Sequence, residues 1–178
     1  MREDIQSILF SQEQLSDRIK ELGTKISADF EGKTPLLVGV LKGSFIFMAD
    51  LVRNITIPCS VEFMALSSYG EKSKTTGAVK MHLDLSVDIE DRHIIIVEDI
   101  LDSGLTLSYL QNYLNVRNPA SISIVTLLDK PGRRSVPVKA DYIGFKVPDS
   151  FVVGYGLDFA EKYRNLPYIG ILKPEVYA

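Results

Sequence analysis

The stretch HIIIVEDILDSGLTL, residues 93–107, decides the fold. It begins with the most apolar run of the chain, which has the length and composition of a buried strand. Three acids, Glu98, Asp99 and Asp102, stand within five positions at the end of that run, and small hydroxyl-bearing and glycine residues follow. An ordinary strand end does not need so much negative charge. We therefore interpret the stretch as the end of a central strand that carries a binding site.

Buried strands alternate with amphipathic helices on both sides of this stretch. Such alternation across residues 35–147 is typical of an α/β fold with a mainly parallel twisted sheet flanked by helices. We expect the residues after about 150, which are rich in Gly, Pro and aromatics, to pack on the sheet rather than continue it. A first helix is predicted after Ser11, its N-cap, with an apolar face formed by Leu15, Ile19, Leu22 and Ile26. Two further helices are predicted at residues 45–55 and 103–116. The predicted strands are residues 35–41, 59–69, 79–87, 93–100, 121–130 and 140–148.

The composition excludes several classes of protein. The 178 residues are 46% hydrophobic and 24% charged, with a net charge of −3 and a pI near 5.4. This is typical of a globular domain and argues against a broad nucleic-acid surface. One cysteine, Cys59, and two histidines argue against a disulfide or a zinc site. We find no signal-peptide core and no run near the roughly 18 apolar residues that span a bilayer, so we expect a cytoplasmic protein without membrane contact.

The acidic stretch predicts a site for a phosphorylated ligand. Ligands bind beyond the carboxyl ends of the strands in open parallel sheets. The first free amides of the following helix, the hydroxyls of Ser103 and Thr106 and the close approach allowed by Gly104 would form an anion cradle. Acids beside a phosphate need a divalent cation or sugar hydroxyls between them, and magnesium suits carboxylate and phosphate oxygens. The alternative, in which Asp102 and Ser103 merely cap the helix, leaves the other two acids unexplained.

The same residues resemble a known motif. The segment VEDILDSGLTL, residues 97–107, resembles the phosphoribosyl-pyrophosphate motif of type I phosphoribosyltransferases. The resemblance implies that fold, with a single domain over residues 1–178, a core at about 35–150, and a small hood formed by the N-terminal segment and about 150–178. Four further segments resemble the hypoxanthine–guanine phosphoribosyltransferases: LKGS at 41–44, SSYG at 67–70, LLDKPGRR at 127–134 and SFVVGYGLDFAEKYRNLPYIGIL at 150–172.

The resemblance implies an activity and a magnesium cofactor. The activity is transfer of ribose 5-phosphate from phosphoribosyl pyrophosphate to N9 of hypoxanthine, and of guanine, which gives IMP or GMP and pyrophosphate. Glu98 and Asp99 would hold the ribose hydroxyls, directly or through Mg²⁺, and Asp102 would exchange a proton with purine N7. Leu105 stands where relatives often have lysine, so phosphate binding there must rest on amides and hydroxyls. The residues assigned to the 5′-phosphate are Asp102, Ser103, Gly104, Leu105 and Thr106.

Two further groups of residues receive roles from the resemblance. The pyrophosphate group is Leu41, Lys42, Gly43 and Arg164, with a cis peptide between the first two. The purine group is Lys130, Phe151, Val152 and Asp158, of which Asp158 is also assigned to a second magnesium. An ammonium only donates hydrogen bonds, which suits the O6 of a 6-oxopurine and disfavours the amino group of adenine. Each segment taken alone has a structural interpretation: a turn for LKGS, an exposed lysine, and core or turn for FVVGYG.

The polar segment GEKSKTTGAVK predicts a long mobile loop at residues 70–80, within a hairpin. In relatives this loop begins at the residues matching Ser68 and Tyr69 and closes over the reacting centre. The resemblance also implies a homodimer or homotetramer. We assign no role to Cys59 or to the two histidines. We interpret the two arginines of PGRR as part of a solvated turn, with phosphate or subunit binding as the alternative.

Three other classes of function compete with the transferase. A regulatory protein that keeps this fold and binds RNA or a nucleotide is disfavoured by the net acidity and by the presence of Asp102, Lys130 and Arg164. A dehydrogenase is disfavoured because no G-x-G-x-x-G follows a strand. A P-loop kinase is excluded because the sequence has no G-x-x-x-x-G-K-[ST] segment.

Overall fold

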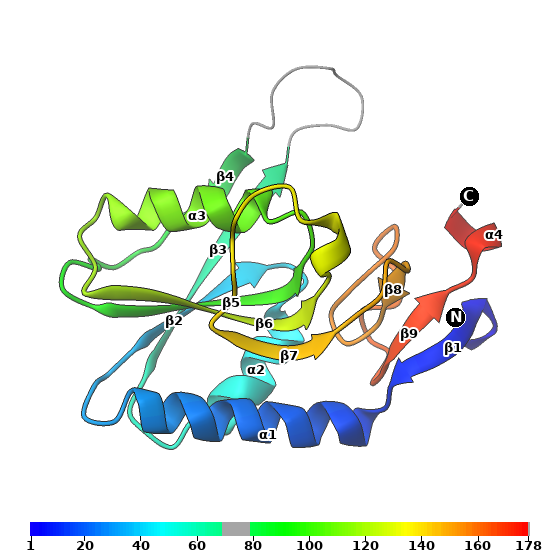
Figure 1. Ribbon diagram of the computed structural model, residues 1–178, viewed down its shortest axis with the longest axis horizontal. Coiled ribbons are helices and arrows are strands. Elements are labelled where there is room, and N and C mark those ends of the chain that lie inside the picture. Colours follow the sequence, from blue (N-terminus) through cyan, green and yellow to red (C-terminus); the bar gives the residue numbers. More distant parts are fainter. Residues whose placement is uncertain (69–78, 178) are drawn as a thin grey trace.

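The computed structural model describes residues 1–68 and 79–177 and confirms the α/β fold. Its main sheet has six strands in the order β4-β3-β2-β5-β6-β7 (Figure 1). All neighbouring pairs in it are parallel except β3 and β4, so the acidic strand β5 lies inside the sheet as predicted. The strands are β2 (Leu36–Leu41), β3 (Ser60–Ser68), β4 (Val79–Leu83), β5 (His93–Leu101), β6 (Ser121–Asp129) and β7 (Tyr142–Lys146).

Helices cover both faces of this sheet. The helices α1 (Gln12–Asp29) and α2 (Phe45–Arg53) lie on one face and α3 (Leu105–Asn115) lies on the other (Figure 1). Alternate residues of the buried strands supply the two cores: Ile95 packs with α1 and α2, whereas Ile94 packs with α3. The apolar runs predicted as buried strands are thus buried on both faces, which is typical of parallel sheets.

The predicted first helix has the expected start. Ser11 is the N-cap of α1: its Oγ accepts a hydrogen bond from the N–H of Gln14, and the Gln14 side chain accepts one from the N–H of Ser11. This reciprocal pair satisfies two free amides at the start of the helix. The four apolar residues predicted for its inner face, Leu15, Ile19, Leu22 and Ile26, are all buried.

The terminal segments form a second sheet, which the sequence predicted only in part. Strands β1 (Ile5–Phe10), β9 (Ile169–Leu172) and β8 (Val152–Val153) pair antiparallel in the order β1-β9-β8. The C-terminal residues therefore do not continue the main sheet, as expected. We did not predict a strand at 5–10, because only pairing with the distant β9 organises it. Two short 3₁₀ helices (Arg2–Asp4 and Pro131–Arg133) and α4 (Pro174–Tyr177) complete the elements.

The hairpin prediction needs three corrections. Strands β3 and β4 are antiparallel, with Ser68 paired to Val79, so the hairpin pairing is confirmed, but β4 ends at Leu83 and not at residue 87 as predicted. The predicted loop at 70–80 extended two residues too far, since Val79 and Lys80 belong to β4, and Ser68 is the last residue of β3. Tyr69 and residues 70–78 lie outside the described residues.

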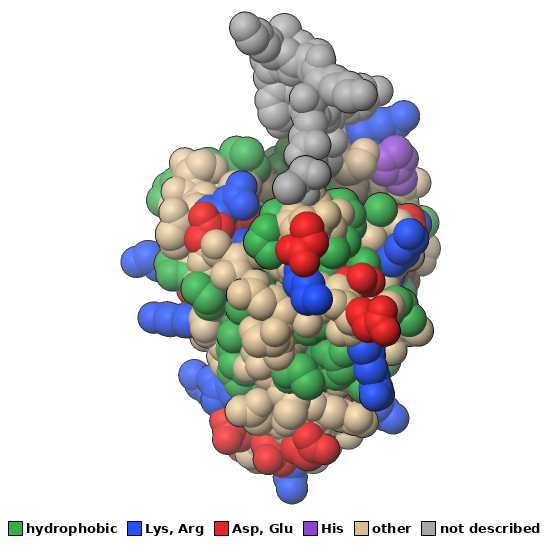
Figure 2. Space-filling model, turned by 90° about the vertical axis from the view of Figure 1, so that its right-hand side faces the viewer, with side chains coloured by type: hydrophobic (Ala, Val, Ile, Leu, Met, Phe, Trp, Pro, Cys, Tyr) green, Lys and Arg blue, Asp and Glu red, His purple; other side chains and the backbone are tan. Residues whose placement is uncertain are grey.

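The surface is mixed in charge. On the side that carries β1, β9 and the two termini, acidic and basic side chains are interspersed among hydrophobic ones (Figure 2). Such mixing fits the small net charge of −3. Within the described ranges, no helix has the length and hydropathy required to cross a membrane.

Candidate active site

Two adjacent acids near the end of β5 reach the same pocket. Glu98 and Asp99 both line a pocket of about 240 Å³ at the carboxyl end of the sheet. Neighbouring strand side chains ordinarily point to opposite faces. Val97 packs on the α1–α2 side, so regular alternation would place Ile100 on the α3 side and Leu101 on the α1–α2 side. The structure shows the opposite, since Ile100 packs on the α1–α2 side and Leu101 on the α3 side. The irregular strand end therefore allows both carboxylates to address one ligand.

Burial raises the pKa of both acids. Glu98 is only 8% exposed, and burial, reinforced by the negative charge of Asp99, raises its pKa well above the usual value. Burial also raises the pKa of the Asp99 carboxyl. No ion pair within 4.0 Å joins either carboxylate to a residue in the described part of the chain, although the more distant charge of Arg164 partly opposes the rise in the pKa of Asp99. Buried acids without a cationic partner are suited to bind a cation or hydroxyl groups.

The loop after β5 presents free amides to the same pocket. Gly104 is the N-cap of α3, with a left-handed φ of 84° and no side chain of its own to cap the helix. The Oγ of Ser103 accepts a hydrogen bond from the N–H of Leu105 at 3.4 Å. The capping alternative thus holds for Ser103 but not for Asp102, which accepts no hydrogen bond from an amide of α3, and the buried Glu98 is not the exposed acid that this alternative requires. Ser103, Gly104 and Thr106 line the pocket, whereas Leu105 is 48% exposed. A helix start with free amides is an anion site.

A second pocket adjoins the first. Its volume is about 270 Å³, and it shares Asp99, Ile100 and Asp102 with the first pocket. The four residues predicted to hold a purine lie together in it: Lys130, Phe151, Val152 and Asp158. Residues from two distant parts of the chain thus meet the acidic loop, and Asp102 stands where the two pockets join. One oxygen of Asp102, Oδ1, is buried without a hydrogen-bond partner among the described residues, and lies 3.5 Å from Nε of Arg133.

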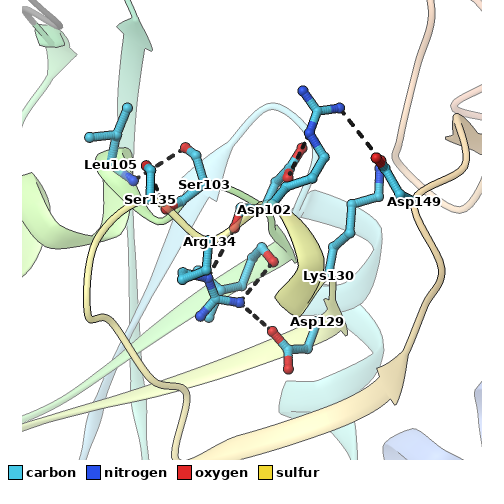
Figure 3. Close-up of polar contacts among 10 residues, drawn as sticks. Asp102, Ser103, Leu105, Asp129, Lys130, Arg134, Ser135 and Asp149 are labelled. Atoms are coloured by element: carbon cyan, nitrogen blue, oxygen red, sulfur yellow. Dashed lines mark hydrogen bonds and ion pairs between the residues drawn. The ribbon is translucent and has the colours of Figure 1, made fainter.

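Lys130 is buried, contrary to what a lone lysine before a Pro-Gly turn would suggest. It is 5% exposed, and its Nζ lies 3.5 Å from Oδ1 of Asp149, a side chain that is 65% exposed (Figure 3). Burying an ammonium is unfavourable unless it has a partner. A single exposed carboxylate at this distance leaves donors of Lys130 available to a ligand in the second pocket.

The ring of Phe151 is held by other aromatics. It stacks on Tyr177 of α4 at a centroid distance of 4.9 Å and makes an edge contact with Phe159 at 5.5 Å. Phe151 is still 37% exposed, whereas the adjacent Val152 is buried. An exposed, fixed aromatic ring that lines a pocket is a suitable platform for a flat ligand.

Close packing against Asp99 explains the glycine of LKGS. A Cβ at Gly43 would lie 1.6 Å from Oδ2 of Asp99, and a Cβ at Gly156 would lie 2.2 Å from the carbonyl oxygen of Gly43. Gly43 is therefore required by the neighbouring acid and not only by the turn. The peptide bond between Leu41 and Lys42 is cis, as the resemblance predicted.

Arg164 makes several contacts at the edge of the site. Its Nη2 lies 2.9 Å from Oδ1 of Asp158, and its Nη1 donates to the carbonyl oxygen of Gly156 at 2.8 Å. The carboxylate of Glu161 accepts hydrogen bonds from both Lys42, at 3.2 Å, and Arg164, at 3.4 Å. The two side chains predicted for pyrophosphate are thus connected through Glu161, a residue for which we predicted no role.

The solvated-turn interpretation of PGRR is wrong for Arg134. Its side chain is 19% exposed, it forms an ion pair with Asp129, and it donates to main-chain carbonyls of the loop after β5 (Figure 3). Arg133 is 56% exposed but lines the second pocket. Hydrophobic periodicity could not reveal the role of these two arginines, because both follow a Pro-Gly turn and belong to no predicted helix or strand. Only the proximity of the ends of β5 and β6 makes Arg134 part of the site.

The histidines and the cysteine have structural contacts, in agreement with the sequence. His82 is hydrogen-bonded to Ser67 at 2.6 Å and His93 to Ser121 at 2.7 Å, each between neighbouring strands. Cys59 packs against the core on the α1–α2 side, and burial raises its pKa. A raised pKa keeps the thiol protonated and makes it a poor nucleophile.

Comparison with known proteins identifies the family. The model for the phosphoribosyl transferase domain matches residues 6–160. The hypoxanthine-guanine phosphoribosyltransferase of Bacillus subtilis is 52% identical over 177 residues, which are 99% of this chain and 98% of that protein. The chain belongs to the hypoxanthine–guanine phosphoribosyltransferase family.

Members of this family also share the structure. A crystal structure of a hypoxanthine phosphoribosyltransferase from Staphylococcus aureus matches with a TM-score of 0.96 and 48% identity, over 100% of this chain and 97% of that one. The bifunctional protein TilS/HprT of Listeria innocua is 53% identical over 178 residues, but this chain spans only 28% of its length. A phosphoribosyltransferase domain of this kind therefore also occurs as part of a longer protein.

Proposed function

We propose that this chain transfers the 5-phosphoribosyl group from phosphoribosyl pyrophosphate to N9 of hypoxanthine, and of guanine, giving IMP or GMP and pyrophosphate. One observation carries the proposal: a pocket with two acids and free amides joins, at Asp99 and Asp102, a pocket with a buried lysine and a fixed aromatic ring. The first has the donors and acceptors for a phosphorylated sugar, and the second has those for a 6-oxopurine. In the reaction, the bond from ribose C1′ to pyrophosphate breaks and the bond from C1′ to N9 forms.

The first pocket would hold the sugar and its phosphate. Glu98 and Asp99 would hold the ribose 2′- and 3′-hydroxyls, either by accepting hydrogen bonds from them or by binding a Mg²⁺ that the hydroxyls also coordinate. The amides that begin α3, with the hydroxyls of Ser103 and Thr106, bind the 5′-phosphate. Leu105 adds no charge, which fits a cradle built on main-chain amides.

The acidic pair fits a magnesium ion. Within residues 1–68 and 79–177, no three His, Cys, Asp or Glu side chains form a group that could hold a metal ion alone. Magnesium commonly binds through one or two carboxylates together with substrate oxygens. Glu98 is buried and Asp99 partly buried, and neither has an ion-pair partner in the described ranges. Bound Mg²⁺ would neutralise charge on the pyrophosphate leaving group. Asp158 is the further candidate ligand, although both its oxygens already have protein partners.

The second pocket would select and orient the base. Lys130 donates to the O6 of the purine, Phe151 stacks on the ring, and Val152 offers main-chain groups to its edge. Asp102 accepts the proton that the base loses as the C1′–N9 bond forms, through N7. Because Lys130 can only donate, the amino group of adenine has no acceptor at this position.

The pyrophosphate would leave from the edge formed by the β2–α2 turn. Leu41, Lys42 and Gly43 offer main-chain groups there, and Arg164 offers a guanidinium, which suits phosphate oxygens. A cytoplasmic location, in keeping with the single Cys59, and a homodimer or homotetramer complete the proposal.

The test is a transfer assay on the purified protein. Phosphoribosyl pyrophosphate and Mg²⁺ are mixed with hypoxanthine, guanine, xanthine or adenine, and pyrophosphate release is measured together with the nucleotide formed. We expect turnover with hypoxanthine and guanine, none with adenine, and loss of turnover when Mg²⁺ is chelated. Absence of turnover with every 6-oxopurine would refute the proposed function.

A further inference from the structure

We propose that Arg134, supported by Ser135, is a positioning residue that directs the phosphate-binding amides into the first pocket. The inference rests on the proposed function, and it adds a residue pair that does not itself line that pocket. Arg134 and Ser135 follow β6, whereas the amides belong to the loop between β5 and α3. Four hydrogen bonds join the two segments (Figure 3).

Arg134 and Ser135 bind the carbonyl side of the phosphate loop. Nε of Arg134 donates to the carbonyl oxygen of Asp102 at 3.0 Å, and Nη2 donates to that of Leu101 at 3.3 Å. The main-chain N–H and the Oγ of Ser135 both donate to the carbonyl oxygen of Ser103, at 2.9 and 3.2 Å. Three consecutive carbonyls are therefore held on one side of the loop.

Planarity of the peptide converts this restraint into a direction for the amides. In a trans peptide the C=O and the following N–H point in opposite directions. When the carbonyls of Asp102 and Ser103 point to Arg134 and Ser135, the N–H groups of Ser103 and Gly104 point away from them. Both residues line the first pocket, and no described residue accepts a hydrogen bond from either N–H. These two donors are thus left for a ligand.

Arg134 is itself fixed by its surroundings. Its Nη1 donates to the carbonyl oxygen of Val138 at 2.6 Å, and its Nη2 pairs with the buried carboxylate of Asp129. Val138 is 6% exposed and belongs to the core under α3. A Cβ at Gly104 would lie 3.1 Å from Cδ of Arg134, so the loop also packs directly on the arginine stem. The restraint is therefore anchored in the core.

Only arginine has the geometry for this set of contacts. Three carbonyls and one carboxylate lie around its guanidinium, which presents five N–H donors in a rigid plane. A lysine would keep the positive charge but would place all its donors on one atom. Arg134→Lys therefore tests the geometry of the contacts separately from their charge.

The experiment compares the binding of IMP with the binding of inosine by calorimetry. The ratio of the two affinities isolates the contribution of the 5′-phosphate, because the base and sugar are the same. We expect Arg134→Lys to lower this ratio about tenfold, the effect of one misdirected hydrogen bond to a charged group. We also expect it to raise the KM for phosphoribosyl pyrophosphate while the KM for hypoxanthine changes little.

Arg18→Lys is the matched control. Arg18 also donates to two main-chain carbonyls, those of Ile143 and Gly144 at 2.8 Å, but it lies between α1 and β7, away from both pockets. Arg18→Lys should lower the melting temperature without changing the ratio of IMP affinity to inosine affinity. Should Arg134→Lys fail to fold, Asp129→Asn keeps the arginine and removes the charge that fixes it, and it should lower the ratio in the same direction.

If folded Arg134→Lys keeps the wild-type ratio of IMP affinity to inosine affinity, the inference is overturned while the proposed function stands. If Arg134→Lys does not fold, an unchanged ratio in Asp129→Asn has the same meaning. A wild-type protein that binds IMP no better than inosine would contradict the proposed function itself, and the inference with it.

Discussion

Asp102 is the residue on which the two halves of the site converge. Its carboxylate lines both pockets, and its Oδ1 is buried without a hydrogen-bond partner in the described part of the chain. Arg133 brings a positive charge near this atom, with Nε at 3.5 Å, but donates no hydrogen bond to it, so the acceptor is left for a ligand. The N–H of a bound purine is the donor that the proposed function supplies, which makes Asp102 the acceptor of the transferred proton.

We expect Asp102→Asn to lower kcat about a hundredfold or more, the usual contribution of a general base. The amide has nearly the same shape, so the KM values for base and phosphoribosyl pyrophosphate should change much less. Steady-state kinetics with hypoxanthine checks this. Asp141→Asn, in which the replaced side chain only accepts from the N–H of Ile124, is the control for effects on stability. A variant that loses binding but keeps kcat would remove the assigned role.

Lys130→Ala tests the recognition of O6. Loss of a hydrogen bond from a charged donor should weaken binding of hypoxanthine and guanine about tenfold or more. The KM for phosphoribosyl pyrophosphate should stay nearly constant, because Lys130 lines only the second pocket. Competition binding with hypoxanthine, guanine and adenine measures the effect. An unaltered preference for 6-oxopurines would contradict the assignment.

At the scale of elements, the site is built from three turns at the carboxyl ends of β2, β5 and β6. The β2–α2 turn contributes Gly43, the β5–α3 loop contributes Asp102, and the segment after β6 contributes Lys130. Arg134, in that last segment, binds the β5–α3 loop from outside the pockets. Parallel strands bring these turns to one edge of the sheet, where ligands bind in such folds. The turns then contact each other directly, so a change in one displaces groups in the next.

Gly43→Ala should show this dependence. The new Cβ would overlap Oδ2 of Asp99, at 1.6 Å, so the acid or the turn must move. Displacement of a reacting group by about 1 Å can lower rates about a hundredfold, and we expect a fall of that size in kcat/KM for phosphoribosyl pyrophosphate. Gly132→Ala is the control, since nothing lies within 4 Å of its added Cβ. Equal activity of the two variants would contradict the packing described here.

The sequence predicted these elements unequally well. Apolar runs and periodicity are local signals, so β2, β5, α1 and α3 could be recognised without knowledge of their neighbours. Strand β1 could not, because Ile5–Phe10 has a partner only in β9, at the other end of the chain. Arg134 was misread for the same reason: its acceptors on Leu101 and Asp102 are more than thirty positions away. Features set by long-range pairing need the folded structure.

At the scale of the whole molecule, the second pocket lies between the two sheets. Asp102 and Lys130 come from the ends of the six-stranded sheet, while Phe151, Val152 and Asp158 lie in or beside β8, the strand of the small sheet that pairs with β9. The small sheet therefore does more than cover the main one, since it supplies one wall of the proposed base site. Contacts of the main sheet that lie far from the second pocket should affect the stability of the protein but not its activity, so the two can be tested separately.

Asp84 offers such a test. Partial burial raises the pKa of Asp84, but hydrogen bonds from Tyr113 and Arg117 of the α3 region outweigh this and leave the pKa below its usual value. A lowered pKa adds stability that is present above the unfolded value of about 3.8 and is lost as the pH falls through the folded value. Asp84→Asn should therefore lower the melting temperature at pH 7, and the difference from wild type should shrink toward pH 3.

Thermal unfolding across this pH range measures the effect, with kcat for hypoxanthine followed at pH 7. Asp17→Asn, on the exposed side of α1, is the control and should leave the melting temperature nearly unchanged. A difference between Asp84→Asn and wild type that is constant with pH would show that the ionised carboxylate is not what stabilises this contact.

The central claim is that the two adjoining pockets form one site for a purine nucleotide, and a crystal structure of the protein with IMP tests it most directly. The account predicts the 5′-phosphate within hydrogen-bond distance of the main-chain N–H groups of Ser103 and Gly104. It predicts the hypoxanthine ring on Phe151, with O6 at Lys130 and N7 at Asp102. A phosphate bound elsewhere, or a base outside the pocket lined by Lys130 and Phe151, would contradict the account.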